Sequence, residues 1–266
     1  MAQDSEVVRF LKSQGYKYVH FQSGFGLTDY NENADVNIKV KSSRLNRFSM
    51  MLLKMSILQP LTKNFIANDL RNRYVYTFYQ LAEMPKIKGP KFVFAHLVSP
   101  HPPFVFGRNG EPVKEFKDTP ATTDVFMYAD WEPPERYVDQ LAYTSKRIDW
   151  VVGQIIANSK TKPIIILQAD HGPAVSAKGQ ERLDSRPFDQ RPYYMKARAE
   201  IFNAYYMPGG KNAALFESIT PVNTFRVIFN EYFKTNYEPL PDITYYSTYS
   251  MPFKFTKLDE DFFSKN

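Results

Sequence analysis

The chain has 266 residues, of which 43% are hydrophobic and 16% aromatic. A disordered chain is poor in aromatic residues, so disorder is excluded for most of the length. The absence of cysteine excludes disulfides, thiolate metal sites and a cysteine nucleophile. The net charge of +6 suits a phosphate or sulfate ester, an anionic lipid headgroup or a nucleic acid, and equally a soluble domain with scattered lysines.

We expect neither a nucleic-acid partner nor a membrane span in this chain. No long basic run, zinc-finger spacing or RNP motif accompanies the positive charge. Residues 1–6 are polar and do not lead into the apolar h-region of a signal peptide. The longest apolar stretch, 48–61, is interrupted by Lys54 and Pro60, whereas a bilayer crossing needs about 20 apolar residues. The chain itself is therefore expected to be soluble.

Hydrophobic periodicity predicts helices and strands in the first part of the chain. Val7, Val8 and Leu11 share one helical face, and the residues of 16–22 alternate as in a strand. Pro60 separates two later helical patterns. The predicted elements are a helix over 4–14, a strand over 16–22, a loop over 23–33, and helices over 43–58 and 60–84.

The second part combines continuous apolar runs with a strongly amphipathic helix. The runs KFVFAHLV at 91–98 and PIIILQA at 163–169 suit strands buried on both faces of a parallel sheet. With the helix over 134–159 between them, they predict a parallel, right-handed βαβ unit. Further predicted elements are an aperiodic segment over 104–134, a polar loop over 174–198, a strand over 200–207, a helix over 221–233 with Thr220 as its N-cap, and a surface tail over 237–266.

The patterns together predict one α/β domain over 1–266, with a mainly parallel sheet flanked by helices. In such sheets ligands bind beyond the carboxyl ends of the strands, and there Asp170, His171 and Gly172 follow the strand over 163–169. A carboxylate and an imidazole suit a divalent metal such as Zn²⁺ or Mn²⁺, and Gly172 removes bulk where a substrate approaches. The alternative, equally open, is a histidine that hydrogen-bonds a loop beside an ordinary aspartate.

The other three histidines have different settings. His101 follows the strand over 91–98 in a turn that three prolines stiffen. A stiff backbone holds the side chain in one position, which suits a histidine that has to contact a transferred group accurately. His96 and His20 lie inside predicted strands, where a core histidine bonded to a neighbour is the favoured interpretation.

Four segments, in the same order, resemble the superfamily of sulfatases, alkaline phosphatases and lipoteichoic acid synthases, over roughly residues 5–235. They are LKSQGYKYVHFQSG at 11–24, HPPF at 101–104, the apolar strand with Asp-His-Gly at 163–172, and NAYYMP at 203–208. The resemblance implies that Asp170 and His171 are metal ligands and that His101 contacts the substrate headgroup. It also implies a divalent cofactor (Zn, Mn, Mg or Ca) and a phosphate or sulfate ester substrate, with lipid-linked and glycan-linked esters both open.

The likeness is greatest to membrane-anchored, sulfatase-like or lipoteichoic acid synthase-like bacterial proteins of the cell envelope. A longer parent protein of that kind would place this domain at the extracytoplasmic face of the membrane. The chain would then meet the membrane only through that parent.

One part of the family pattern is not found. The family carries its Thr, Ser or modified nucleophile, with one or two acidic metal ligands, upstream of the region that resembles 11–24, and no such block precedes Gly15. Ser99 and Ser176 are the local hydroxyls that could replace the nucleophile. We therefore expect an N-terminally truncated catalytic domain that is inactive alone, because a metal with about two protein ligands lacks the usual three or four.

Three interpretations stay open. The first is part of a metal-dependent hydrolase, or of a transferase of the phosphoglycerol or phosphoethanolamine type. The second is a non-catalytic, degenerate domain that binds an anionic glycan, a lipid headgroup or a partner protein. The third is an unrelated α/β protein with chance motifs. Whether the chain is an enzyme is therefore not decided by its sequence.

Overall fold

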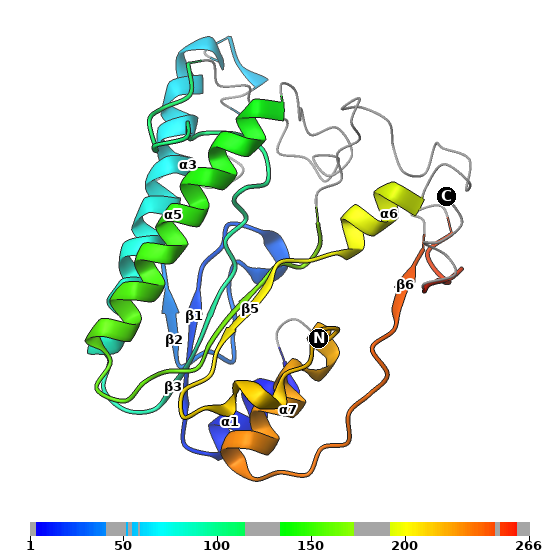
Figure 1. Ribbon diagram of the computed structural model, residues 1–266. Helices are drawn as coiled ribbons and strands as arrows, with labels where there is room; N and C mark the ends of the chain where they lie inside the picture. Colours follow the sequence, from blue (N-terminus) through cyan, green and yellow to red (C-terminus); the bar gives the residue numbers. More distant parts are fainter. Residues whose placement is uncertain are drawn as a thin grey trace. The chain divides into compact units, whose positions relative to one another are not determined.

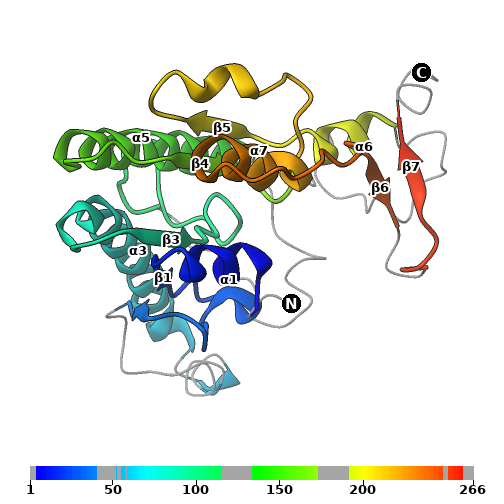
Figure 2. The same cartoon turned by 90° about the horizontal axis from the view of Figure 1, so that it is seen from below.

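The computed structural model describes residues 4–40, 52, 55–57, 59–114, 134–172, 192–247 and 251–259. The chain divides into two compact units, Met1–Lys160 and Thr161–Asn266. Figure 1 and Figure 2, which shows the molecule from below, together label the helices and strands of both units. None of the helices within the described ranges combines the length and the apolar character that crossing a membrane requires.

A parallel three-stranded sheet lies in the first unit. Its strands, in spatial order, are β2 (Val36–Ile38), β1 (Lys17–Phe21) and β3 (Lys91–Ala95). Val19 of the central strand stands opposite Val36 on one side and Val93 on the other. Val19 and Phe21 on one face and Tyr18 and His20 on the other are all buried, as expected for a strand that is covered on both faces. Because both pairings are parallel, the carboxyl ends of the three strands meet at one edge.

Three helices accompany this sheet in the first unit. They are α1 (Glu6–Ser13), α3 (Gln59–Ala82) and α5 (Pro134–Asn158), with the 3₁₀ turns η1 (Gly26–Thr28) and η2 (Met84–Lys86). α3 packs against α5 around a core in which Tyr74 and Phe78 join Phe106 and Val151. α1 ends at Ser13, and Gly15 follows its C-cap with a φ of 82°, in the left-handed region that glycine adopts without strain.

The described residues of the second unit form two antiparallel pairs of short strands and two helices. Its elements are β4 (Ile165–Gln168), α6 (Pro192–Ala199), β5 (Asn203–Tyr206), the 3₁₀ turn η5 (Lys211–Ala214), α7 (Pro221–Phe233), β6 (Thr244–Tyr246) and β7 (Thr256–Leu258). β4 pairs with β5, with Gln168 opposite Asn203, and β6 pairs with β7.

The segment after α7 is hydrogen-bonded to the start of that helix. Asn223 is fully buried, and its amide nitrogen donates to the carbonyl of Leu240 (2.7 Å) and to Asp242 Oδ2 (2.9 Å). Asp242 also accepts hydrogen bonds from the backbone N–H and the hydroxyl of Thr220. Thr220 therefore occupies the predicted N-cap position but does not cap the helix with its side chain, because Asp242 engages its hydroxyl.

Most of the predicted strands and helices are present, with boundaries that differ by a few residues. The confirmed strands are those predicted over 16–22, 91–98, 163–169 and 200–207, and the confirmed helices are those predicted over 4–14, 60–84, 134–159 and 221–233. The predicted helix over 43–58 and the aperiodic segment over 104–134 lie largely outside the described residues.

The predicted βαβ unit is wrong in its pairing. β3 and β4 belong to different hydrogen-bonded sheets, and β4 pairs with β5 in the antiparallel sense. The apolar run of β4 correctly indicated a strand, but a run of this kind does not specify which strand it pairs with or in which direction. The α/β class agrees with the parallel sheet and helices of the first unit, whereas both described strand pairs of the second unit are antiparallel.

Other elements were missed because their local signals are weak. Residues 192–199, predicted as loop, form α6, which carries no clear hydrophobic stripe, although Pro192 occupies a favourable first position. β2, β6 and β7 are each three residues long, too short to display the alternation by which strands are recognised. β6 and β7 lie within the predicted tail over 237–266.

His20 is a titratable side chain in the core of the first unit. This buried residue of β1 has Nδ1 3.0 Å from the Tyr18 hydroxyl and Nε2 2.9 Å from the Thr28 carbonyl. Because a carbonyl only accepts, Nε2 carries the proton and Nδ1 accepts from Tyr18. Burial lowers the pKa of His20, against the smaller opposing effect of its hydrogen bond to Thr28. Burial also raises the pKa of Tyr18 to about 12, so the hydroxyl keeps its proton.

We expect the free energy of unfolding to fall as the pH is lowered from about 7.5 to about 5.5. The unfolded chain takes up a proton on His20 near its ordinary pKa of about 6.5, whereas the folded chain resists it, so acid favours unfolding. Urea unfolding at several pH values measures this dependence. His20→Gln cannot titrate there and should show a shallower dependence. An equal pH dependence in both proteins would contradict the assignment.

Candidate functional site

Strand β4 leads into the Asp-His-Gly segment, and the backbone of α6 closely approaches the turn that follows. The N–H of Ala169 donates to the carbonyl of Phe202 (2.8 Å), and the N–H of Gly172 donates to the carbonyl of Arg198 (2.8 Å). A Cβ atom at Gly172 would lie 1.9 Å from the carbonyl oxygen of Ala197. The turn therefore needs glycine for the close approach of α6, a reason that differs from the predicted one, room for a substrate.

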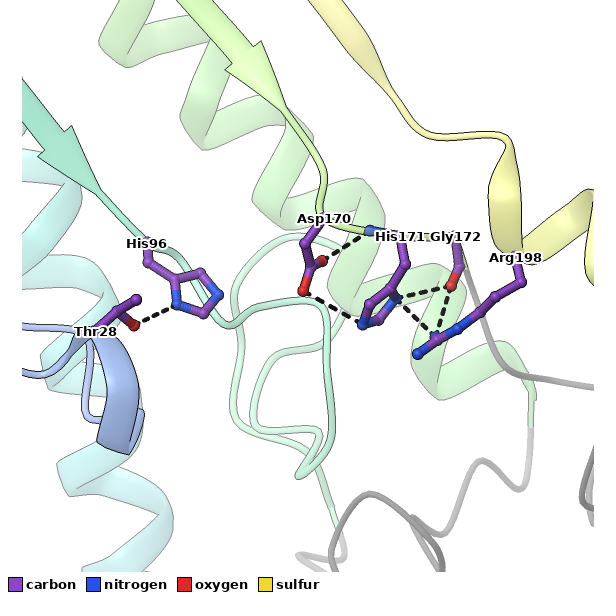
Figure 3. Close-up of polar contacts among 6 residues, drawn as sticks. All are labelled: Thr28, His96, Asp170, His171, Gly172 and Arg198. Atoms are coloured by element: carbon purple, nitrogen blue, oxygen red, sulfur yellow. Dashed lines mark hydrogen bonds and ion pairs between the residues drawn. The ribbon is translucent and has the colours of Figure 1, made fainter. Parts of the chain in front are cut away.

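Asp170 and His171 turn their side chains toward each other beyond the end of β4 (Figure 3). Asp170 Oδ2 lies 3.3 Å from His171 Nε2, and Asp170 Oδ1 accepts a 3.0 Å hydrogen bond from the backbone N–H of His171. The side chains are 73% and 37% exposed, so solvent reaches both. Two donor atoms bound at about 2.0–2.2 Å to one tetrahedral ion lie about 3.4 Å apart, so this spacing fits a shared divalent metal.

The pair alone would not complete a metal site. The described residues contain no group of three or more His, Cys, Asp or Glu side chains that could hold an ion. Structural zinc sites use four protein ligands, and catalytic ones use about three with water in the open position. Asp170 and His171 therefore fit a divalent ion as two of its ligands.

Arg198 of α6 restrains the imidazole of His171 (Figure 3). Its Nη1 lies 2.7 Å from His171 Nδ1 and donates to the carbonyl of Gly172 at 2.9 Å. The same carbonyl lies 3.0 Å from His171 Nδ1. When Nδ1 accepts from Arg198, the ring proton sits on Nε2 and faces Asp170. Because a guanidinium only donates, this is the tautomer that the 2.7 Å contact requires. Nε2 offers a lone pair to a metal once Arg198 leaves Nδ1 and Nδ1 donates to the carbonyl, as in metal-binding histidines that are held by a carbonyl.

Sequence reasoning missed Arg198. It lies 27 residues beyond His171, and no short motif links the two. The contact arises because α6 returns the chain to the end of β4, and α6 was itself predicted as loop.

His101 lies in the first unit, in a tightly hydrogen-bonded turn. Its backbone N–H donates to the carbonyl of Val98 (2.9 Å), and its Nδ1 lies 2.6 Å from the carbonyl oxygen of Pro102. Because a carbonyl only accepts, Nδ1 carries the ring proton and Nε2 is the acceptor nitrogen of the neutral ring. Gln140 of α5 donates to the carbonyl of His101 at 3.3 Å. Because both motifs directly follow predicted strands, the sequence leads us to expect His101, Asp170 and His171 in one cleft. Asp170 and His171 belong to the second unit, and this convergence stays a prediction.

The two histidines that were interpreted as core residues both contact neighbours. His20 is bonded to Tyr18 and Thr28, as described above. His96 Nδ1 lies 2.7 Å from Thr28 Oγ1 (Figure 3). However, β3 ends at Ala95, so half-buried His96 lies at the carboxyl end of the strand and not within it.

Of the two candidate substitute nucleophiles, Ser99 and Ser176, the structure describes Ser99. Ser99 is buried, and its hydroxyl lies 2.6 Å from Thr144 Oγ1 of α5. Ser99 therefore joins the proline turn to α5 and is enclosed, which does not suit a nucleophile that has to reach a substrate. Ser176 lies outside the described residues.

Comparison with known proteins places most of the chain in one family. The sulfatase family model matches residues 2–236, and residues 237–266 lie beyond the match. No curated protein and no solved structure matches the chain. Sulfatase domains have the α/β fold of the alkaline phosphatase-like superfamily, and the parallel three-stranded sheet with its flanking helices agrees with that fold.

The contact between Gly172 and α6 predicts the cost of adding a methyl group there. We expect Gly172→Ala to destabilise the protein by about 1–3 kcal/mol, because the new Cβ meets the backbone of Ala197 and one of the two segments has to shift. Thermal and urea unfolding measure the loss.

Gly153→Ala is the matched control. Gly153 is an exposed residue of α5, and a Cβ atom there would meet nothing within 4 Å. Alanine is a better helix former than glycine, so this variant should gain about 0.5–1 kcal/mol. Equal effects of the two substitutions would show that α6 does not approach Gly172 as described.

Proposed function

The chain belongs to the sulfatase family, and on that basis we propose that its domain hydrolyses or transfers a sulfate or phosphate ester with a divalent metal held by Asp170 and His171. Sulfatase-family domains generally bind a divalent metal. The observation that carries the proposal is the separation of 3.3 Å between Asp170 Oδ2 and His171 Nε2, which suits two ligands of one ion. When bound, such an ion stabilises the charge that develops on the ester oxygens.

The residues around the pair support this role. When Arg198 leaves Nδ1, the Gly172 carbonyl holds a proton on His171 Nδ1 and so orients Nε2 for a metal. Arg198 donates to the same carbonyl and places a permanent positive charge beside the pair. A guanidinium in this position favours the approach of an anionic ester, because its forked N–H groups match sulfate and phosphate oxygens.

We assign His101 to contact with the substrate. The hydrogen bond between its Nδ1 and the Pro102 carbonyl fixes the tautomer, so that Nε2 of the neutral ring accepts a proton and the protonated ring donates one. A histidine held in this way can stabilise the oxygen of a leaving group or position a headgroup. Lipid-linked or glycan-linked esters, and an extracytoplasmic site of action, belong to the same proposal.

Metal titration of residues 1–266 tests the assignment of the ligands. We expect weak binding of Mn²⁺ or Zn²⁺, because two side chains leave the other positions to water. Asp170→Asn and His171→Gln should each weaken it by at least about tenfold, the range for losing even an outer partner of a metal site. Calorimetry measures the affinity. Asp139→Asn, at an exposed carboxylate paired with Arg108, should leave it unchanged.

Assays with aryl sulfates, aryl phosphates and glycerophospholipids test the chemistry of the same protein. We expect no turnover by residues 1–266 alone, because the sequence carries no recognisable nucleophile block. Turnover that disappears with Asp170→Ala would confirm the metal-dependent reaction and show that the expectation of inactivity is wrong. Metal binding that survives both Asp170→Asn and His171→Gln would contradict the proposed site.

A further inference from the structure

Gln140 is a completely buried polar residue inside α5. Its carboxamide oxygen accepts hydrogen bonds from the backbone N–H groups of Val105 (2.8 Å) and Phe106 (3.3 Å). Its amide nitrogen donates to the carbonyls of Pro100 and His101, each at 3.3 Å. A carboxamide has two N–H donors and an oxygen with two lone pairs. Gln140 therefore directs all four of its hydrogen bonds to the backbone of one short segment.

The position of this glutamine on α5 is unusual for its chemistry. The residues through which the same helix joins the hydrophobic core are apolar or aromatic: Tyr143, Ile148, Trp150, Val151 and Ile155. A buried polar side chain destabilises the fold unless its hydrogen bonds are made. Segment 100–106 belongs to no helix or strand of the described chain, so its buried N–H and carbonyl groups need other partners. Gln140 supplies those partners.

The hydrogen bonds of Gln140 determine how the backbone runs at His101. The N–H of His101 donates to the carbonyl of Val98, and its carbonyl accepts from Gln140, so both backbone groups of this residue are held. The ring contact of His101, Nδ1 at 2.6 Å from the Pro102 carbonyl, is made to the next residue in the chain. That contact depends on the backbone torsions between the two residues, and these are fixed by what holds the segment.

We propose that Gln140 is a positioning residue for His101. By holding the backbone before and after His101, its carboxamide keeps the imidazole in one orientation, with the proton on Nδ1 and the lone pair on Nε2. A ring that is ordered before a substrate arrives loses less conformational entropy when it makes contact. The inference rests on the proposed function for the contact between His101 and substrate, but the state of the ring is a property of the chain without metal or ester.

NMR of the chain with ¹⁵N-labelled histidine measures the tautomer of each ring, in EDTA at a pH of about 8, where a histidine of ordinary pKa is neutral. His101→Gln identifies the signals of His101, which should show the proton mainly on Nδ1. Gln140→Glu keeps the shape and one oxygen acceptor, but its second oxygen faces the carbonyls of Pro100 and His101 and cannot donate to them when ionised. The ratio of the Nδ1–H to the Nε2–H form of His101 should fall about fivefold or more, the factor for one hydrogen bond.

Thr144→Val is the matched control for a general loosening of α5. Thr144 lies four residues after Gln140, is also buried, and has its hydroxyl 2.6 Å from Ser99 Oγ. Valine keeps the shape and removes that bond but leaves the four bonds of Gln140, so the tautomer of His101 should not change. The ring of His20, with its proton on Nε2, should be the same in all of these proteins and shows that the sheet is intact.

A second variant and a measurement on the unaltered chain apply where Gln140→Glu does not fold. Gln140→Asn is neutral and one methylene shorter, so it cannot reach all four backbone groups, and it should lower the same ratio. In the unaltered chain, the side-chain amide protons of Gln140 should exchange with solvent about tenfold or more slowly than those of exposed Gln14.

Three results would overturn the inference. They are a His101 ring that carries its proton mainly on Nε2 in the unaltered chain, a ratio that is unchanged in the folded Gln140 variants or changes equally in Thr144→Val, and exchange at Gln140 as fast as at Gln14. Because neither metal nor ester is present, loss of metal binding or of turnover tests the proposed function separately.

Discussion

The parallel hydrogen bonding of β1 between β2 and β3 is the constraint on which the first unit depends. It buries Val19 and Phe21 and places the carboxyl ends of three strands at one edge. Thr28 and His96 are 68 residues apart in sequence, yet they come within hydrogen-bonding distance there. If β3 were displaced in register by one residue, His96 would turn to the other face of the sheet and the contact would be lost.

The second unit depends on a different contact, the close approach of α6 to the end of β4. Gly172 permits that approach, since any side chain would meet the carbonyl of Ala197. The same approach carries Arg198 to the ring of His171. One backbone contact therefore fixes both the shape of the turn and the charge beside it. Each unit has a glycine in the loop that follows a strand. Gly24 after β1 is approached by the side chain of Arg73, and Gly172 after β4 is approached by the backbone of α6.

The sequence predicted most of the regular elements because their signals are local. The apolar runs at 91–98 and 163–169 indicated β3 and β4, and the bounds of α7 agree with the prediction at 221–233. Pairing between strands is not local, so the partner and direction of β4 were predicted wrongly. The resemblance to the sulfatase family agrees with the match over 2–236.

The candidate site was predictable only where its residues adjoin a strand. Asp170 and His171 were found because they follow β4 directly, and their mutual distance of 3.3 Å follows from the turn that Gly172 allows. Arg198 was not found, because it meets its loop through a helix that packs from elsewhere in the chain.

The positive charge of the chain has two different uses in the structure. Arg147 of α5 lies 4.4 Å from the ring centre of Trp150 and 5.0 Å from that of Tyr79, and its buried Nε and Nη2 have no hydrogen-bond partner among the described residues. The faces of these rings replace a carboxylate as the stabilising partner of the guanidinium. Arg71 likewise lies over the ring of Phe106 and donates to the carbonyl of Gly110.

Arginines of this kind strengthen the helix pair and give no information about a ligand. Arg198 is different, because it lies 2.7 Å from the imidazole of His171 beyond the end of β4. Arg73 rests against Gly24 in the loop that follows β1. The net charge of +6 was compatible with an anionic substrate and equally with a basic surface that binds no ligand. The guanidiniums differ in their surroundings: aromatic rings lie against Arg147 and Arg71, whereas Arg198 lies against an imidazole and a carbonyl at a strand end.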